Sequence, residues 1–283
     1  MEIKKVGVVG CGSMGAGIAQ LCAQSGYQVV VSEINDAFLK RGMGSIDKVL
    51  ARSVEKGKLS QTDKDAIMGR IKGTTSTKDF SDCDLVIEAA IENLELKKKI
   101  FAELDGICPS HAILATNTSC LSIIDMAVVT KRPDKVLGLH FFNPAPIMKL
   151  LEIVKTIATS DEVVKASQKF GESLGKTTVI ARDAPGFIVN RLWIPFLLHS
   201  IRLYEDGVAS REDIDNAISL GLNYPMGPLT LSDMVGIDVV KFVSDALYEQ
   251  LKDPRYIVPT LVDKMVAAGW LGRKTGKGFY DYK

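Results

Sequence analysis

The feature that most constrains this chain is a glycine-rich stretch near its beginning, Gly10-Cys11-Gly12-Ser13-Met14-Gly15. It directly follows a short β-branched run over residues 3–9 and opens a run of small residues with helical spacing over residues 13–25. An acidic residue, Glu33, follows the second apolar run, about twenty residues beyond the glycines. This order of strand, glycine turn, helix and acid is typical of a βαβ unit that binds a dinucleotide.

The glycines of such a turn have different physical roles. Gly10 permits the tight turn, Gly12 lets main-chain N–H groups approach a pyrophosphate, and Gly15 lets the helix pack against the strand. Glu33 accepts hydrogen bonds from ribose hydroxyls and repels a 2′-phosphate, which favours NAD(H) over NADP(H). The alternative is an ordinary βαβ turn with a surface glutamate. The predicted cofactor-binding residues in this region are Gly10, Gly12, Ser13, Met14, Gly15 and Glu33.

Strand-like and helix-like runs alternate over the first two thirds of the chain, which predicts an α/β fold of the Rossmann type with a doubly wound, mostly parallel sheet. Two successive helices, 36–55 and 61–71, form a helical-hairpin insertion joined at Lys56-Gly57-Lys58. A shorter helix is expected at 121–129. Strands are expected at 3–9, 28–31, near 73, and at 84–88, 112–115, 135–142, 150–154 and 177–181.

The pattern changes at Asp183-Ala184-Pro185-Gly186, after which every run has helical spacing and is bounded by Gly or Pro. Pro185 suits the first residue of a helix because its missing N–H costs nothing there. We therefore expect an NAD-binding Rossmann-type domain at 1–184 and an all-helical domain at 185–283. Its helices are expected at 186–206, 211–220, 229–233, 237–251 and 259–268.

Charge and cysteine content exclude several classes of function. The chain has 35 basic and 34 acidic residues, so nothing favours nucleic acid or a membrane surface as a partner. Its five cysteines show no C-x-x-C spacing, which argues against a zinc module or a disulfide framework; no metal site is expected, and reduced thiols indicate a cytoplasmic protein. The apolar stretch 6–23 has the look of a signal peptide, but its glycines weaken such a helix.

Three polar side chains occupy positions where an open α/β sheet binds its ligand, and a fourth lies at the predicted domain boundary. His140 and Ser119 each follow or end an apolar strand, and Glu152 lies inside the apolar run 150–154, where a carboxylate needs a partner. Asn190 follows the predicted domain boundary. Simpler roles remain open: a carbonyl-bound buried histidine, a serine that caps the helix at 121–129, and an asparagine that bonds across the boundary.

The first insertion helix carries a basic face. Lys48, Arg52 and Lys56 recur at intervals of four residues, and Ser45 lies three residues before the first of them. Such a run is usually a solvated helix face. The functional interpretation is a docking site for a polyanionic substrate handle, such as the phosphates of a nucleotide.

Over its whole length the chain resembles the short-chain 3-hydroxyacyl-CoA dehydrogenases. The most specific stretches are GLHFFNPAPIMKLLEIV and YPMGPLTLSDMVGID, followed by IEAAIENLELKK, TNTSCLSI, APGFIVNRL and GRKTGKGFYDYK. The resemblance implies NAD-dependent oxidation of (S)-3-hydroxyacyl-CoA, or the reverse reduction of acetoacetyl-CoA to 3-hydroxybutyryl-CoA. Butyrate-type fermentation and fatty-acid breakdown are both compatible with that reaction.

The resemblance also implies roles for single residues. His140 is then the catalytic base with Glu152 as its partner, while Ser119 and Asn190 contact the substrate oxygen. The family dimerises through its helical domain, which implies a homo-oligomer. Dinucleotide contacts fall at Glu92, Lys97, Asn143 and Lys274, and coenzyme A contacts at Ser45 and a basic residue near Lys48, Arg52 or Lys56.

Two other classes of protein share the dinucleotide fold. A β-hydroxyacid dehydrogenase acts on free acids and carries a catalytic lysine after the sheet, but the corresponding stretch 186–190 reads GFIVN. A redox sensor would keep the dinucleotide site without the chemistry. The presence of Ser119, His140, Glu152 and Asn190 together argues against that.

Overall fold

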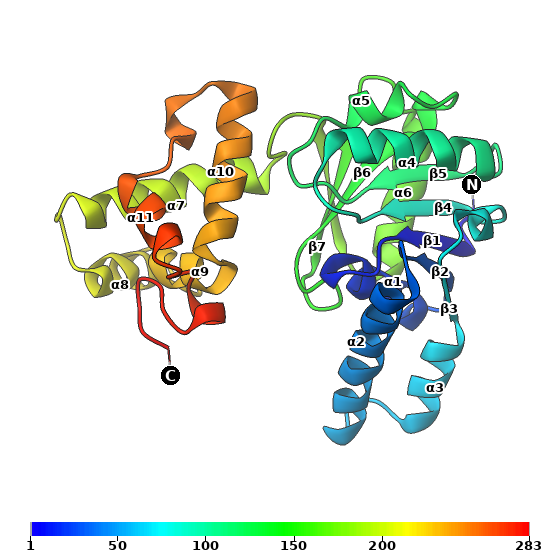
Figure 1. The fold of residues 1–283 in the computed structure, drawn as a ribbon, viewed down its shortest axis with the longest axis horizontal. Coiled ribbons are helices and arrows are strands. Elements are labelled where there is room, and N and C mark those ends of the chain that lie inside the picture. The colour runs from blue at the N-terminus through cyan, green and yellow to red at the C-terminus, as the bar shows by residue number, and fades with distance from the viewer. Residues whose placement is uncertain (1, 283) are drawn as a thin grey trace. The chain divides into compact units, whose positions relative to one another are not determined.

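The computed structural model describes residues 2–282, which divide into two compact units, one ending at Ala184 and the other beginning at Pro185 (Figure 1). None of the helices within these residues is both long and apolar enough to cross a membrane. The strands of the first unit are β1 (Lys5–Val9), β2 (Gln28–Ser32), β3 (Ile71–Thr74), β4 (Leu85–Glu88), β5 (Ile113–Thr116), β6 (Val136–Phe141), β7 (Leu150–Lys155) and β8 (Thr177–Arg182).

These eight strands form a single sheet in the order β3-β2-β1-β4-β5-β6-β7-β8. All neighbours are parallel except β6 and β7, which run antiparallel. The expected mostly parallel sheet of the Rossmann type is therefore confirmed. Its helices are α1 (Ser13–Gln24), α2 (Asp36–Glu55), α3 (Gln61–Gly69), η1 (Thr77–Phe80), α4 (Leu94–Ile107), α5 (Ile123–Ala127), η2 (Pro133–Lys135) and α6 (Asp161–Ser173).

Helices cover both faces of this sheet. Val8 of β1, Ile18 of α1 and Phe170 of α6 belong to one core cluster, so α1 and α6 lie on the same side. Gly7 points to the other side, because a Cβ there would lie 2.7 Å from the ring of Phe80 in η1. Helices α4 and α5 pack beside η1 and β6 on that side. The sheet is thus buried on both faces, as strands in α/β proteins are.

The helical-hairpin insertion is present as α2 and α3, which extend away from the sheet in Figure 1. Polar caps define where its helices begin: Asn35 accepts a hydrogen bond from the Phe38 N–H, and Ser60 accepts one from the Asp63 N–H. The expected end of α3 at residue 71 was wrong. Ile71 instead pairs with Val29 and opens β3, because sheet pairing and burial outweigh continued helix.

Helix α5 is shorter than the expected 121–129. It begins at Ile123, after Ser122, and ends at Ala127. Asp183, which follows β8, accepts hydrogen bonds from the N–H groups of Ile123 and Ile124 at 3.0 and 2.8 Å. A residue 60 positions away therefore stabilises the start of this helix, and no local pattern indicates it.

The second unit is all-helical, as expected. Its helices are α7 (Val189–Glu205), α8 (Arg211–Gly221), α9 (Pro228–Val235), α10 (Ile237–Leu251), η3 (Pro254–Tyr256), α11 (Thr260–Ala267) and η4 (Arg273–Thr275). One cluster of buried apolar residues in their core comprises Ile201, Ile214, Leu229, Ile237, Val262, Met265 and Phe279.

The expected helix start at Pro185–Gly186 was wrong by several residues. Gly186 and Phe187 have φ angles of +75° and +47°, which lie in the left-handed region and cannot belong to a right-handed helix. Helix α7 therefore begins only at Val189. Asn190 is its second residue and is 8% exposed.

Candidate active site

Three polar residues lie at the C-terminal ends of neighbouring parallel strands, where open α/β sheets bind ligands. Glu88 ends β4, Thr116 ends β5, and His140 is the last but one residue of β6. Side chains alternate between the faces of a sheet, so these three share the face opposite the core cluster of α1 and α6. The residue before each of them belongs to that cluster: Ile87, Ala115 and Leu139.

His140 and Glu152 form a buried pair. They stand opposite each other in the antiparallel register of β6 and β7, and Nδ1 of His140 lies 2.6 Å from Oε2 of Glu152. The imidazole is 4% exposed and the glutamate 0%. An ionised carboxylate accepts the proton of Nδ1, which leaves Nε2 as the nitrogen that can exchange a proton with a substrate. The carboxylate of Glu152, which was expected to need a partner within its apolar strand, thus has one in His140.

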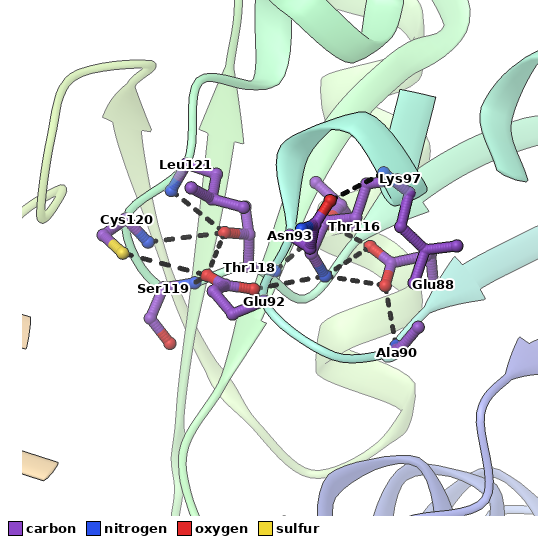
Figure 2. Close-up of polar contacts among 11 residues, drawn as sticks. Glu88, Ala90, Glu92, Asn93, Lys97, Thr116, Thr118, Ser119, Cys120 and Leu121 are labelled. Carbon is purple, nitrogen blue, oxygen red and sulfur yellow. Dashed lines mark hydrogen bonds and ion pairs between the residues drawn. The ribbon is translucent and has the colours of Figure 1, made fainter. Parts of the chain in front are cut away.

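Glu92 holds the turn that carries Ser119, the turn that follows β5 (Figure 2). Its Oε1 accepts a hydrogen bond from the main-chain N–H of Ser119 at 3.0 Å and another from the hydroxyl of Thr118. Ser119 is partly exposed and lies four residues before α5, so it is not the cap of that helix. The simpler role considered for Ser119 is therefore wrong.

Lys97 of α4 is almost wholly buried, with 1% of its side chain exposed. Its ammonium nitrogen lies 2.7 and 2.8 Å from the two carboxylate oxygens of Glu88 and 3.2 Å from Oε2 of Glu92. In this structure Lys97 therefore contacts two protein carboxylates, of which only Glu92 is itself a predicted dinucleotide contact.

The glycine turn has the tight backbone geometry that was expected of Gly10 and Gly15. Gly10 has φ +94°, and a Cβ at Gly15 would lie 1.9 Å from the carbonyl oxygen of Gly10, so α1 and the turn approach as only glycine allows. Gly12 caps α1 without a side-chain hydrogen bond and faces open space. The first N–H groups of α1 are therefore free of any capping side chain, and the space beside them suits a pyrophosphate.

Glu33 lies beside that turn. Its Oε1 accepts a hydrogen bond from the main-chain N–H of Cys11 at 3.0 Å, and its Oε2 accepts one from Ile34 at 2.9 Å. The acid that follows β2 therefore reaches the glycine turn through space, as binding of a ribose next to a pyrophosphate requires. On these observations the residues of the turn fit a dinucleotide.

The five cysteines are all buried, and none of them forms a disulfide. Burial raises the pKa of the Cys120 thiol to about 12, and the neighbouring Glu92 carboxylate adds to the effect. A protonated thiol is a poor nucleophile. The raised pKa therefore does not favour Cys120 as a nucleophile, although it directly follows Ser119.

The basic face of the insertion helix is exposed. Gly42, Ile46 and Leu50 are the buried residues of α2, and they occupy the opposite side. Lys56 is the C-cap residue of that helix rather than part of it. The exposed set comprises Ser45, Lys48, Arg52 and Lys56.

The remaining predicted contacts are Asn143, Asn190 and Lys274. Asn143 is exposed in the segment that follows β6. Asn190 and Lys274 belong to the second unit, where Lys274 forms an ion pair with Asp238 at 2.5 Å. The roles of these three residues remain predictions.

Sequence reasoning missed Glu88, Thr116 and Thr118, which connect Lys97 and Glu92 to the turn of Ser119. One signal was available. Glu88 ends the apolar run 84–88, and an acid at the end of a fully buried strand needs a partner as much as Glu152 does.

An enzyme that transfers hydride with a dinucleotide needs a cradle for the pyrophosphate and a group that exchanges a proton with the substrate. The first unit has both at the C-terminal ends of its parallel strands. By fold and site, the protein is thus a dinucleotide-dependent dehydrogenase.

Comparison with known proteins identifies the family. Residues 5–184 match the family model of the 3-hydroxyacyl-CoA dehydrogenase NAD binding domain, and residues 186–282 match that of the 3-hydroxyacyl-CoA dehydrogenase C-terminal domain. The chain belongs to the 3-hydroxyacyl-CoA dehydrogenase family.

Relatives agree over the full length. The chain is 45% identical to a 3-hydroxybutyryl-CoA dehydrogenase of Mycobacterium tuberculosis over 282 residues, covering 99% of both chains. The crystal structure of M. tuberculosis FadB2 superposes with a TM-score of 0.97 at 45% identity and full coverage of both chains. The (S)-3-hydroxybutyryl-CoA dehydrogenase PaaH1 of Ralstonia eutropha superposes with a TM-score of 0.94 at 44% identity, also with full coverage of both.

Proposed function

We propose that this protein is an NAD(H)-dependent dehydrogenase that interconverts (S)-3-hydroxybutyryl-CoA and acetoacetyl-CoA. The single observation that carries the proposal is the buried His140–Glu152 pair, 2.6 Å apart, at a strand end of a sheet that also presents the glycine turn. The names of the relatives supply the substrate class. When bound, NAD supplies the hydride acceptor and NADH the hydride donor.

The side chains then have the following roles. In the oxidation direction Nε2 of His140 takes the proton of the 3-hydroxyl group, and Glu152 stabilises the resulting imidazolium through Nδ1. In reduction the same nitrogen returns the proton. Ser119 and Asn190 donate hydrogen bonds to the substrate oxygen as it changes between alcohol and carbonyl.

The cofactor and the coenzyme A handle would occupy separate parts of the chain. Gly10, Gly12 and Glu33 would hold the pyrophosphate and the adenosine ribose, assisted by Ser13, Met14 and Gly15 around the same turn. Glu92, Lys97, Asn143 and Lys274 would act on the rest of the dinucleotide. The coenzyme A phosphates would meet the exposed face of α2, at Ser45, Lys48, Arg52 and Lys56.

We also propose separate roles for the two units, a homodimeric assembly and a cytoplasmic location. Residues 1–184 would bind the dinucleotide, and residues 185–283 would contribute to substrate binding and form a homodimer. Exposed apolar side chains on the helices of the second unit support such a contact, for example Leu192 at 71% and Phe242 at 52%. Five cysteines that form no disulfide are compatible with a cytoplasmic location. Sedimentation equilibrium would test the dimer.

The test of the activity is a set of initial rates with NADH and NADPH in parallel. The substrates are acetoacetyl-CoA, longer 3-oxoacyl-CoA thioesters and free acetoacetate. We expect the highest kcat/KM with acetoacetyl-CoA and NADH, and Glu33→Ala should narrow the preference for NADH. Equal efficiency with NADPH would overturn the cofactor assignment. Faster turnover of free acetoacetate would instead favour a β-hydroxyacid dehydrogenase.

A further inference from the structure

A second buried acid lies on the same face of the sheet as the His140–Glu152 pair. Glu88 is 0% exposed, and both of its carboxylate oxygens are occupied. Oε1 accepts the main-chain N–H of Ala90 at 2.7 Å, Oε2 accepts the hydroxyl of Thr116 at 2.7 Å, and the ammonium of Lys97 bonds to both oxygens. Burying a carboxylate away from water costs free energy unless its oxygens are hydrogen-bonded and its charge is paired. Glu88 meets both conditions.

The partners of Glu88 lead to the turn of Ser119 by two routes (Figure 2). On the first route Lys97 also contacts Glu92, which accepts the Ser119 N–H through its other oxygen. On the second, Thr116 donates its hydroxyl to Glu88 and accepts the N–H of Thr118 at 3.1 Å. Both routes end at adjacent residues of one short turn.

We propose that Glu88 is a positioning residue that holds the turn at 117–120 and thereby places the hydroxyl of Ser119 for catalysis. This inference rests on the role of Ser119 in the proposed function. A hydrogen-bond donor stabilises a developing charge only if it is already in place, and loss of one such donor typically lowers kcat by about a hundredfold to a thousandfold. Loosening the donor instead of deleting it should lower kcat by about tenfold.

A double-mutant cycle tests this coupling. Glu88→Gln preserves the size of the side chain but removes its charge and part of its acceptor capacity. Kinetic constants for acetoacetyl-CoA reduction at saturating NADH would be compared for the wild type, Glu88→Gln, Ser119→Ala and the double variant. We expect Glu88→Gln to lower kcat by about tenfold alone and by less than about twofold in the Ser119→Ala background. Independent, multiplicative losses would overturn the proposal.

A milder variant guards against misfolding of Glu88→Gln. Thr116→Val is nearly isosteric and breaks only the second route, leaving the buried charge pair intact. It should lower kcat by a few fold, and again only when Ser119 is present. Thr130→Val is the matched control, because Thr130 is also buried, at 8% exposure. Its hydroxyl donates to the carbonyl of Ala127, at the end of α5, and accepts the N–H of Arg132, so it takes no part in either route. The control should leave kcat unchanged.

Amide hydrogen exchange over residues 117–121 reports the same positioning without turnover. Both Glu88→Gln and Thr116→Val should accelerate exchange there by about tenfold, whereas Thr130→Val should not. Unchanged exchange in both variants would refute the positioning role, whatever the activity. Accelerated exchange in a protein that does not reduce acetoacetyl-CoA would leave the positioning role standing and remove the proposed function instead.

Discussion

Both units bury carboxylates, but they pair them differently. In the first unit Glu88 and Glu152 contact side chains that can carry positive charge, Lys97 and His140. In the second unit Asp233 is equally buried, at 1% exposure, but it is bound by the main-chain N–H groups of Phe279 and Tyr280 and the hydroxyl of Tyr282. Burial raises the pKa of Asp233 despite these bonds.

The difference separates two uses of a buried charge. A carboxylate beside an imidazole or ammonium can stabilise a proton that moves, which is what catalysis at a strand end needs. Asp233 instead joins α9 to the end of the chain. The chain is packed tightly around it, because a Cβ at Gly278 would lie 2.0 Å from Oδ1 of Asp233. Under the proposed function the first arrangement would serve catalysis, directly at Glu152 and through positioning at Glu88, whereas Asp233 joins elements of the tertiary structure.

Substitutions in the His140–Glu152 pair should have the greatest effect on activity. His140→Gln should lower kcat by about a hundredfold to ten-thousandfold because acid–base catalysis is lost. Glu152→Gln should also lower kcat, since the ring is then less well oriented. The double variant should be little worse than His140→Gln alone, because the two act as one unit.

The measurements are kcat for both single variants and the double, with NADH affinity determined separately. NADH binding should survive in all three, because the glycine turn and Glu33 are unchanged. Fully multiplicative losses in kcat would mean that Glu152 is a structural carboxylate, like Asp233.

Removing the structural carboxylate Asp233 should have the next greatest effect, on stability. Asp233→Ala leaves two buried main-chain N–H groups without acceptors, which should lower the free energy of unfolding by about 2–4 kcal/mol. Urea unfolding followed by circular dichroism measures this loss. His140→Gln, as the control, should lose far less stability, because the glutamine amide keeps a hydrogen-bond donor for Glu152. Equal losses in the two variants would contradict the distinction between the units.

Removing exposed charges from α2 should have a smaller effect than removing the buried groups. If the face of α2 binds the coenzyme A phosphates, Lys48→Gln/Arg52→Gln should raise KM for acetoacetyl-CoA by about fivefold, with kcat nearly unchanged. The increase should shrink at high salt because exposed charges are screened. Lys165→Gln/Lys169→Gln on α6 removes the same charge from another exposed helix and should leave KM unchanged. An unchanged KM for acetoacetyl-CoA in the α2 variant at low salt would show that this face does not bind coenzyme A.

The pH dependence of the free energy of unfolding should differ between Asp84 in the first unit and Asp233 in the second, and this effect should be small. Burial raises the pKa of Asp84, but the N–H groups of Lys5 and Lys4 and the ring of His111 together hold it below its usual range. Asp84 therefore stabilises the fold above its unfolded pKa, about 3.9, and this contribution is lost as the pH falls. Asp233 has a raised pKa, so its stabilisation relative to Asn should increase as the pH falls from 7 toward 4.

Urea unfolding of Asp84→Asn and Asp233→Asn between pH 7 and pH 3 measures both slopes against the wild type. Asp84→Asn should lower the free energy of unfolding at pH 7, and this difference from the wild type should shrink as the pH falls toward 3. Slopes of the same sign for the two variants would contradict the opposite directions of their pKa shifts.

Local sequence patterns predicted most of the fold and much of the candidate site. The glycine turn, the acid after β2 and the histidine near the end of β6 were all predicted correctly in position, because each depends on residues close together in the chain. Parallel strands then bring their C-terminal ends together whatever the loops between them. Even the need of Glu152 for a partner followed from its apolar neighbours.

Only the tertiary structure decided which distant groups meet. Asp183 starts α5 from 60 residues away, and left-handed residues at 186 and 187 delay α7. Lys97 lies nine residues from Glu88 in sequence, yet only burial of both side chains turns them into one network with the turn of Ser119. Spacing alone assigns residue types to strands and helices. The partner of a buried charge depends on packing between elements, and that information is distributed over the whole chain.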